Sequence, residues 1–185
     1  MKHFWNTKLA IIFFIVGLFS YTISAQKITR FSNKEGFNQN TINTISKDKY
    51  GFLWFGTPNG LIRYDGYDFK TYSNQTNYKQ SIESTNVKFL FNDETGVLWI
   101  GTNLGLNVYI PRTEKFYKVP LNKSISVDLI KAGPGGEIIF IGDHKLHSCK
   151  LINEEEGVFE VSEDVFNPTK ANERITNFSF QKNTL

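Results

Sequence analysis

The chain has 185 residues, of which 40% are hydrophobic and 15% aromatic, and its formal net charge is +3. This length suits one ordinary domain with a packed core, and the aromatic content favours β structure. The small net charge, without a lysine and arginine cluster, argues against nucleic-acid binding through this segment. A single cysteine, Cys149, excludes an internal disulfide.

The first 25 residues are typical of a secretory signal peptide. A basic start precedes the apolar run LAIIFFIVGLF, and small residues end at Ala25, so we predict cleavage between Ala25 and Gln26. The alternative is an uncleaved membrane anchor, but a helix of this run would extend only about 16 Å, roughly half of a bilayer core. The remaining residues, 26–185, are therefore expected in the periplasm, with membrane attachment only through this segment or a helix further along a parent protein.

The segment ITRFSN at residues 28–33 resembles FKTYSN at residues 69–74. The later copy closes a repeated unit, so the earlier one is predicted to be a lone outermost strand. It precedes the first complete unit, which begins at about residue 41.

The strongest signal is an internal repeat, GFLWFGT at residues 51–57 and GVLWIGT at residues 96–102. The residues that define it are Trp54, Gly56, Gly60, Trp99, Gly101 and Gly105. A third copy reads GEIIFIG at residues 136–142, and alignment on its last glycine places Phe140 where the other copies have tryptophan. The glycines at 60 and 105 are expected to supply the positive φ of a tight hairpin turn.

Each unit is predicted to hold four short strands, and the second strand is apolar on both faces, as expected for a sheet covered on both sides. The units cover residues 41–74, 85–121 and 125–162, with the start of a further unit at 175–185. The aligned glycines at 56, 101 and 142 are 45 and 41 residues apart. Four-stranded antiparallel sheets that repeat at this spacing indicate an all-β fold of β-propeller blades. A β-sandwich with chance similarity is the alternative, and the doubled motif argues against it. About three blades plus partial strands make an incomplete ring, so we expect the front part of a longer protein.

The units resemble the two-component regulator propeller repeat. The resemblance rests on NTINTISKD at residues 40–48, GFLWFGT at 51–57 and NGLIRYDG at 59–66, with the lead-in EGFNQN at 35–40. It spans about residues 28–161, and the third unit departs from the pattern because it lacks the tryptophan.

This resemblance implies the periplasmic sensor part of a Bacteroidetes-type hybrid two-component histidine kinase. In such proteins, propellers and an immunoglobulin-like domain precede a membrane helix, a kinase and a receiver, and many sense oligosaccharides as homodimers. The kinase chemistry cannot be assigned to any residue here, so this chain is expected to have no catalysis of its own and no cofactor.

The candidate ligand-binding residues lie on or just after the turns that join second and third strands, at one rim of the propeller. They are Asn59, Arg63, Tyr67, Asn103 and Asn107. Core packing is the expected role of Trp54 and Trp99, in preference to sugar stacking.

Other candidate groups are expected to be structural. His144 and His147 are three residues apart and would face opposite sides of a regular strand, which argues against a metal site. Cys149 occupies the repeat position of a tyrosine, so packing is favoured over a reactive thiol. The acidic run at residues 154–156 is typical of a solvated hairpin tip.

Two other functions remain open. A stand-alone exported propeller would bind a protein or glycan and complete its ring by pairing chains. A propeller hydrolase or lyase has no supporting constellation of residues in the sequence.

Overall fold

The computed structural model describes residue 37 and the segments 39–74 and 81–166, with side chains described as far as residue 163. The predicted signal peptide and its cleavage site, the lone strand at 28–33 and the further unit at 175–185 lie outside these residues. In the described segments all regular secondary structure is strand. These segments hold no helix with the length and apolar character needed to span a membrane.

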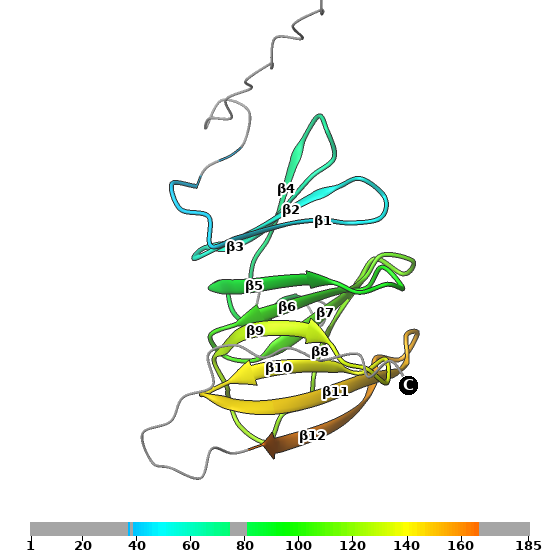
Figure 1. Cartoon of the computed structure of the whole chain (residues 1–185). Coiled ribbons are helices and arrows are strands. Elements are labelled where there is room, and N and C mark those ends of the chain that lie inside the picture. Colours follow the sequence, from blue (N-terminus) through cyan, green and yellow to red (C-terminus); the bar gives the residue numbers. More distant parts are fainter. Residues whose placement is uncertain (1–36, 38, 75–80, 167–185) are drawn as a thin grey trace, which may run out of the picture. The chain divides into compact units, whose positions relative to one another are not determined.

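The strands form three antiparallel sheets of four strands each, which confirms the predicted all-β blades (Figure 1). The first sheet contains β1 (Thr44–Lys47), β2 (Leu53–Thr57), β3 (Gly60–Tyr64) and β4 (Phe69–Tyr72). The second contains β5 (Val87–Asn92), β6 (Leu98–Thr102), β7 (Leu106–Ile110) and β8 (Lys115–Lys118). The third contains β9 (Val127–Ala132), β10 (Ile138–Gly142), β11 (Lys145–Asn153) and β12 (Val158–Phe166).

Each sheet is a simple meander, because its strands are hydrogen-bonded in chain order. Consecutive sheets pack through their first strands, with β1 against β5 and β5 against β9. Three stacked meanders of four strands are the arrangement of propeller blades, whereas a sandwich has two sheets.

Two hydrophobic cores fill the spaces between neighbouring sheets. Trp54 and Leu61 of the first sheet pack with Leu98, Ile100 and Tyr109 of the second. A second cluster joins the opposite face of the second sheet to the third. The strands β6 and β7 are buried along their whole length because neighbouring sheets cover both of their faces, and β10 is also buried along its whole length. This burial explains why these strands do not alternate between apolar and polar residues.

The strand register corrects one sequence alignment in the third sheet. Trp99 pairs with Val108, and the equivalent pair in the third sheet is Ile139 with Ser148. Ile139, and not Phe140, therefore occupies the tryptophan position. Phe140 lies on the opposite face, in the core that contains Trp99.

The glycine positions explain this shift. A Cβ on Gly56 would lie 2.6 Å from Val87 Cγ1, and one on Gly101 would lie 2.8 Å from Val127 Cγ1. A valine of the following sheet thus requires glycine at this register. The third sheet has Ile141 there, and the described segments contain no further sheet that would exclude a larger side chain.

Candidate functional site

The turns of the three sheets gather at two opposite ends. We call the end with the β2–β3, β6–β7 and β10–β11 turns the crossover end, because the connections between sheets also begin and finish there. The other end carries the remaining turns within the sheets and is called the hairpin end. A ligand site on loops would lie at one of these ends.

At the crossover end, a cleft of about 450 Å³ opens between the first and second sheets. Asn43, Pro58, Asn86 and Lys88 line it. Asn43 is fixed because its side-chain Nδ2 donates to the Val87 carbonyl at 2.8 Å. The lining of the cleft therefore combines two side-chain amides, one ammonium group and one apolar proline ring.

Lys88 extends the polar surface toward the third sheet. Its Nζ donates to Ser126 Oγ at 3.0 Å and forms an ion pair with the Asp128 carboxylate. Both partners come from the segment that begins β9, so the ammonium is held between two sheets. The charge of Lys88 is balanced locally, and the cleft has little net charge.

A hydrogen-bonded loop forms the wall behind Asn86. Asn103 donates its backbone N–H to the Asn86 carbonyl at 3.2 Å, and Ser84 Oγ donates to Asn103 Oδ1 at 2.5 Å. The Asn86 N–H in turn donates to Ser84 Oγ at 3.2 Å. In the segments that the structure describes, no hydrogen bond engages the Asn86 side-chain amide, so it is available to a ligand.

This arrangement suits recognition of a polar, uncharged ligand. Side-chain amides offer both donors and acceptors, and a lysine adds donors. Residues 37, 39–74 and 81–166 hold no cluster of three histidine, cysteine or acidic side chains that could bind a metal ion. The geometry therefore supports binding through hydrogen bonds.

Comparisons with known proteins relate part of this chain to a family of sensor repeats. The model of the two-component regulator propeller matches residues 36–59. A histidine kinase of Formosa agariphila is 40% identical over 52 residues, which are 28% of this chain and 4% of that protein.

Two solved structures from B. thetaiotaomicron share the fold. The extracellular domain of the hybrid two-component system BT3049 has a TM-score of 0.50 at 28% identity, over 66% of this chain and 17% of that one. The extracellular domain of BT4673 has a TM-score of 0.62 at 23% identity, over 85% of this chain and 21% of that one. Residues 36–59 thus carry the two-component regulator propeller repeat. It spans about a fifth of the solved structures and a small fraction of the kinase.

The matched propeller repeat covers β1, β2 and the β2–β3 turn. It therefore includes Asn43 and Pro58 of the crossover cleft. Asn59, a predicted ligand residue, follows Pro58 in the β2–β3 turn, where its Nδ2 donates to Gln39 Oε1 at 3.0 Å. Asn103 lies in the corresponding turn of the next repeat, behind Asn86. The structure brings these two predicted residues to one end.

The other three predicted ligand residues lie elsewhere, so the expectation of a common rim was wrong. Tyr67 is 90% exposed in the β3–β4 turn, at the hairpin end. Arg63 lies inside β3, with its side chain only 16% exposed. Asn107 lies inside β7 and is fully buried. Arg63 and Asn107 are only a few residues from a turn in the sequence, but a strand of a hairpin enters the core within one or two residues of the turn. Closeness to a turn in the sequence therefore did not place these two side chains at the rim.

Asn107 has a structural contact in the second sheet. Its Oδ1 accepts the Glu83 backbone N–H at 2.9 Å, which fastens the segment before β5 to β7. Glu83 also lies over Gly105, where a Cβ would be 2.7 Å from Glu83 Oε2. Gly105 does not have the expected positive φ, whereas Gly60 has a φ of 143°. Turn conformation therefore does not require glycine at position 105, and an added Cβ would meet only the flexible end of the Glu83 side chain.

The remaining candidate groups lie apart from the cleft. His144 is in the β10–β11 turn with a φ of 64°, and His147 is buried in β11, stacked on Phe140. His147 Nε2 lies 3.1 Å from the Gly142 carbonyl oxygen. Cys149 is buried, and burial raises the pKa of its thiol to about 12. The packing interpretation of Cys149 is confirmed.

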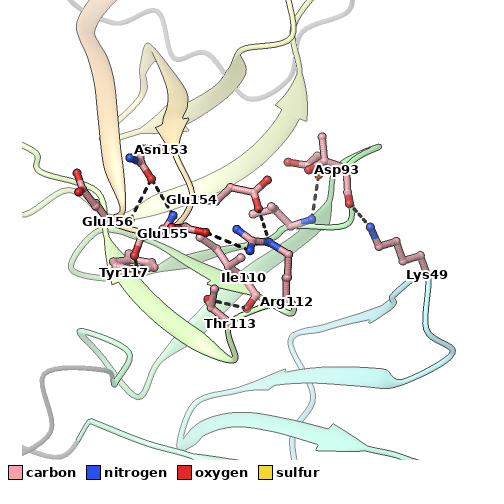
Figure 2. Close-up of polar contacts among 12 residues, drawn as sticks. Lys49, Asp93, Ile110, Arg112, Thr113, Tyr117, Asn153, Glu154, Glu155 and Glu156 are labelled. Carbon is pink, nitrogen blue, oxygen red and sulfur yellow. Dashed lines mark hydrogen bonds and ion pairs between the residues drawn. The ribbon is translucent and has the colours of Figure 1, made fainter.

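The acidic run forms the β11–β12 turn at the hairpin end, as Figure 2 shows. Arg112 Nη1 lies 3.3 Å from Glu155 Oε1, and Arg112 Nε lies 3.7 Å from Glu154 Oε2. These pairs connect the second and third sheets. Lys49 makes a similar connection between the first and second sheets, donating to the Thr95 carbonyl. This end of the repeats is therefore fastened by ion pairs and hydrogen bonds.

Proposed function

We propose that this chain supplies blades to the extracytoplasmic sensor of a hybrid two-component system and binds an oligosaccharide in the crossover cleft. The observation that carries the proposal is the combined match to the two-component regulator propeller repeat and to extracellular domains of such systems. The chain would act by ligand recognition, without catalysis. Assembly as a homodimer in the longer parent stays a prediction.

The chemistry of the cleft supports a sugar as the ligand. Sugar hydroxyls are both donors and acceptors, and the Asn86 amide can satisfy one of each. The Oδ1 of Asn43 remains available as an acceptor, because its hydrogen bond to Val87 uses Nδ2. Pro58 adds an apolar surface that suits the face of a sugar ring.

The position of the cleft between two sheets supports a sensing role. Asn43 and Pro58 belong to the first sheet, and Asn86 and Lys88 belong to the second or its lead-in. A ligand that contacts both sides would favour one spacing of the sheets over another. A ligand shifts a conformational equilibrium only through such a difference in affinity between states.

Binding is tested by calorimetry on the full chain with neutral oligosaccharides of the cello, xylo and malto series. Asn86→Ala should weaken the binding of the active series about five- to thirty-fold, equivalent to one or two lost hydrogen bonds to a neutral ligand. The matched control is Asn153→Ala, at the last residue of β11 beside the hairpin-end turn, which should leave binding unchanged. An unchanged affinity in Asn86→Ala, or an equal loss in the control, would place the sugar elsewhere.

The sensor role is tested in the bacterium that encodes the chain. Asn86→Ala in the chromosomal gene should lower the transcriptional response to the same sugar, at unchanged protein abundance. A full response in a variant that no longer binds the sugar would rule out sensing through this cleft.

A further inference from the structure

A second cavity, of about 170 Å³, lies between the first and second sheets at the hairpin end, opposite the crossover cleft. We call it the Arg63 pocket; its lining is Asp48, Tyr50, Phe52, Arg63, Tyr109, Pro111 and Glu114. Its residues come from β3, β7 and the β1–β2 and β7–β8 turns. Nothing in the proposed sensing at the other end uses this cavity.

Arg63 departs from the repeat at a core position. It pairs with Trp54 across the sheet, and the equivalent partner of Trp99 is Val108, which is fully buried. The Arg63 side chain is only 16% exposed. Burial of a charge where an aliphatic side chain fits is unfavourable unless strong partners compensate for it.

The partners that Arg63 has within the chain are weak. Nη1 donates to the Tyr109 hydroxyl at 3.4 Å and lies 3.9 Å from Glu114 Oε1. The guanidinium also lies 4.8 Å from the centroid of the Phe52 ring. Within the described segments, Nε and Nη2 have no hydrogen bond. Two donors of the planar fork of this cavity-lining residue thus remain without an acceptor, and such a fork pairs with a carboxylate.

The charges around Arg63 also favour an anion. Lys70 lies directly across from Arg63 on β4, and like charges in such a pair are destabilising. The carboxylate of Asp48 is occupied, because it accepts the Trp54 indole N–H at 2.8 Å and the backbone N–H groups of Tyr50 and Phe52. Glu114 is the remaining anionic group, and its side chain is 69% exposed at 3.9 Å from the guanidinium.

Tyr109 adds a donor to the pocket. Burial raises the pKa of its phenol to about 12, so the hydroxyl keeps its proton at neutral pH. That hydroxyl accepts from Arg63, which leaves its own proton for a second acceptor. Tyr50, 55% exposed at the mouth, offers an aromatic face to an apolar group.

We propose that the Arg63 pocket binds a small carboxylate, held by the Arg63 fork and the Tyr109 hydroxyl, with its ring or chain beside Tyr50. Glu114 occupies the approach to the guanidinium in the free chain and swings toward solvent when the ligand enters. The ligand carboxylate can belong to a sugar acid or to a simple organic acid, because the donors recognise the same group in both.

The test measures binding of three probes to the full chain by calorimetry or by NMR line broadening of the probe. D-Glucuronate and 3-phenylpropionate carry the carboxylate on a sugar and on a hydrocarbon, and D-glucose is the uncharged match of glucuronate. At least one acid should bind at least tenfold more tightly than glucose. Preference for glucuronate indicates a sugar acid, and preference for phenylpropionate indicates an organic acid. Equal binding of glucose and glucuronate, or no binding of either acid, would overturn the proposal.

Arg63→Met separates a binding role from a structural one. The variant should lose acid binding, while its thermal midpoint stays equal or rises, because an apolar side chain replaces a poorly compensated buried charge. A clearly lower midpoint would indicate that Arg63 only fastens the sheets. Arg112→Met is the matched control, an exposed arginine with ion pairs at the same end, and should keep acid binding unchanged.

Glu114→Gln provides a gain of function. Removal of the internal carboxylate should tighten acid binding about two- to five-fold, the range of an exposed ion pair. A weaker affinity in this variant would show that Glu114 holds the ligand, and would contradict the proposed exchange of carboxylates.

Discussion

Trp54 donates its buried indole N–H to the carboxylate of Asp48 at 2.8 Å. Trp99 donates to Asp93 at the same distance in the second sheet. In both sheets the acid also closes the turn, because it accepts backbone N–H groups from the residues that follow it. The third sheet has Gly133 and Ile139 at the corresponding positions. The aspartate and the tryptophan are thus replaced together, as expected for two residues that form one unit.

Asp48→Ala should lower the free energy of unfolding by about 2–3 kcal/mol, because it leaves three N–H donors without their charged acceptor. Equilibrium denaturation followed by tryptophan fluorescence measures this loss, and it also reports the altered surroundings of Trp54. Asp65→Ala is the control, since Asp65 accepts two backbone N–H groups in an exposed turn where water can replace it. Equal losses in the two variants would show that the buried indole bond contributes nothing.

The fold could be predicted because the residues that cause each sheet to form are repeated in the sequence itself. The motif around Trp54 combines a strand covered on both faces with a turn that needs Gly60. The third repeat was misaligned by one residue because Gly142 was matched to Gly101. The register depends on Val127, a residue of the next sheet that packs on Gly101, and sequence comparison within one repeat does not contain that neighbour.

None of the five predicted ligand residues lines the crossover cleft, although Asn59 and Asn103 lie in the turns beside it. Asn86 and Lys88 lie outside the motif and reach the cleft only through packing of the sheets. One signal was present but unused. An aspartate precedes each of the two repeat tryptophans by the same six positions, from 48 to 54 and from 93 to 99, which marks the turn-closing acid.

Gly60→Ala is expected to be one of the more destabilising glycine substitutions. The φ of Gly60 is 143°, and an added Cβ would lie 2.7 Å from the Tyr72 carbonyl oxygen. We expect a loss of about 2–4 kcal/mol, from backbone strain plus a clash with main chain that cannot move. Gly51→Ala is the control for strain alone, since its φ is 94° and nothing lies within 4 Å of the added atom. A Gly51→Ala variant as unstable as Gly60→Ala would remove the clash from the explanation.

Gly101→Ala tests the packing of the second sheet on the third. The new Cβ would lie 2.8 Å from Val127 Cγ1, and overpacking of this kind costs about 1–3 kcal/mol. Val127→Ala removes the obstructing atoms but leaves a cavity. The double variant should be less destabilised than the sum of the single variants, by about 1 kcal/mol or more. Strict additivity in denaturant unfolding would mean that the two residues do not contact each other.

Cys149 should be unreactive in the folded chain and should weaken the fold at alkaline pH. Burial raises the pKa of its thiol to about 12, whereas an unfolded cysteine has a pKa of about 8.5. Between these values the unfolded chain releases a proton that the folded chain retains, so stability is fully present below pH 8.5 and falls as the pH rises. Between about pH 7.5 and about pH 9.5 we expect a loss of about 1 kcal/mol that is absent in Cys149→Ala. Labelling with a thiol-specific disulfide reagent should follow the rate of unfolding, and rapid labelling of the native chain would contradict the burial of this residue.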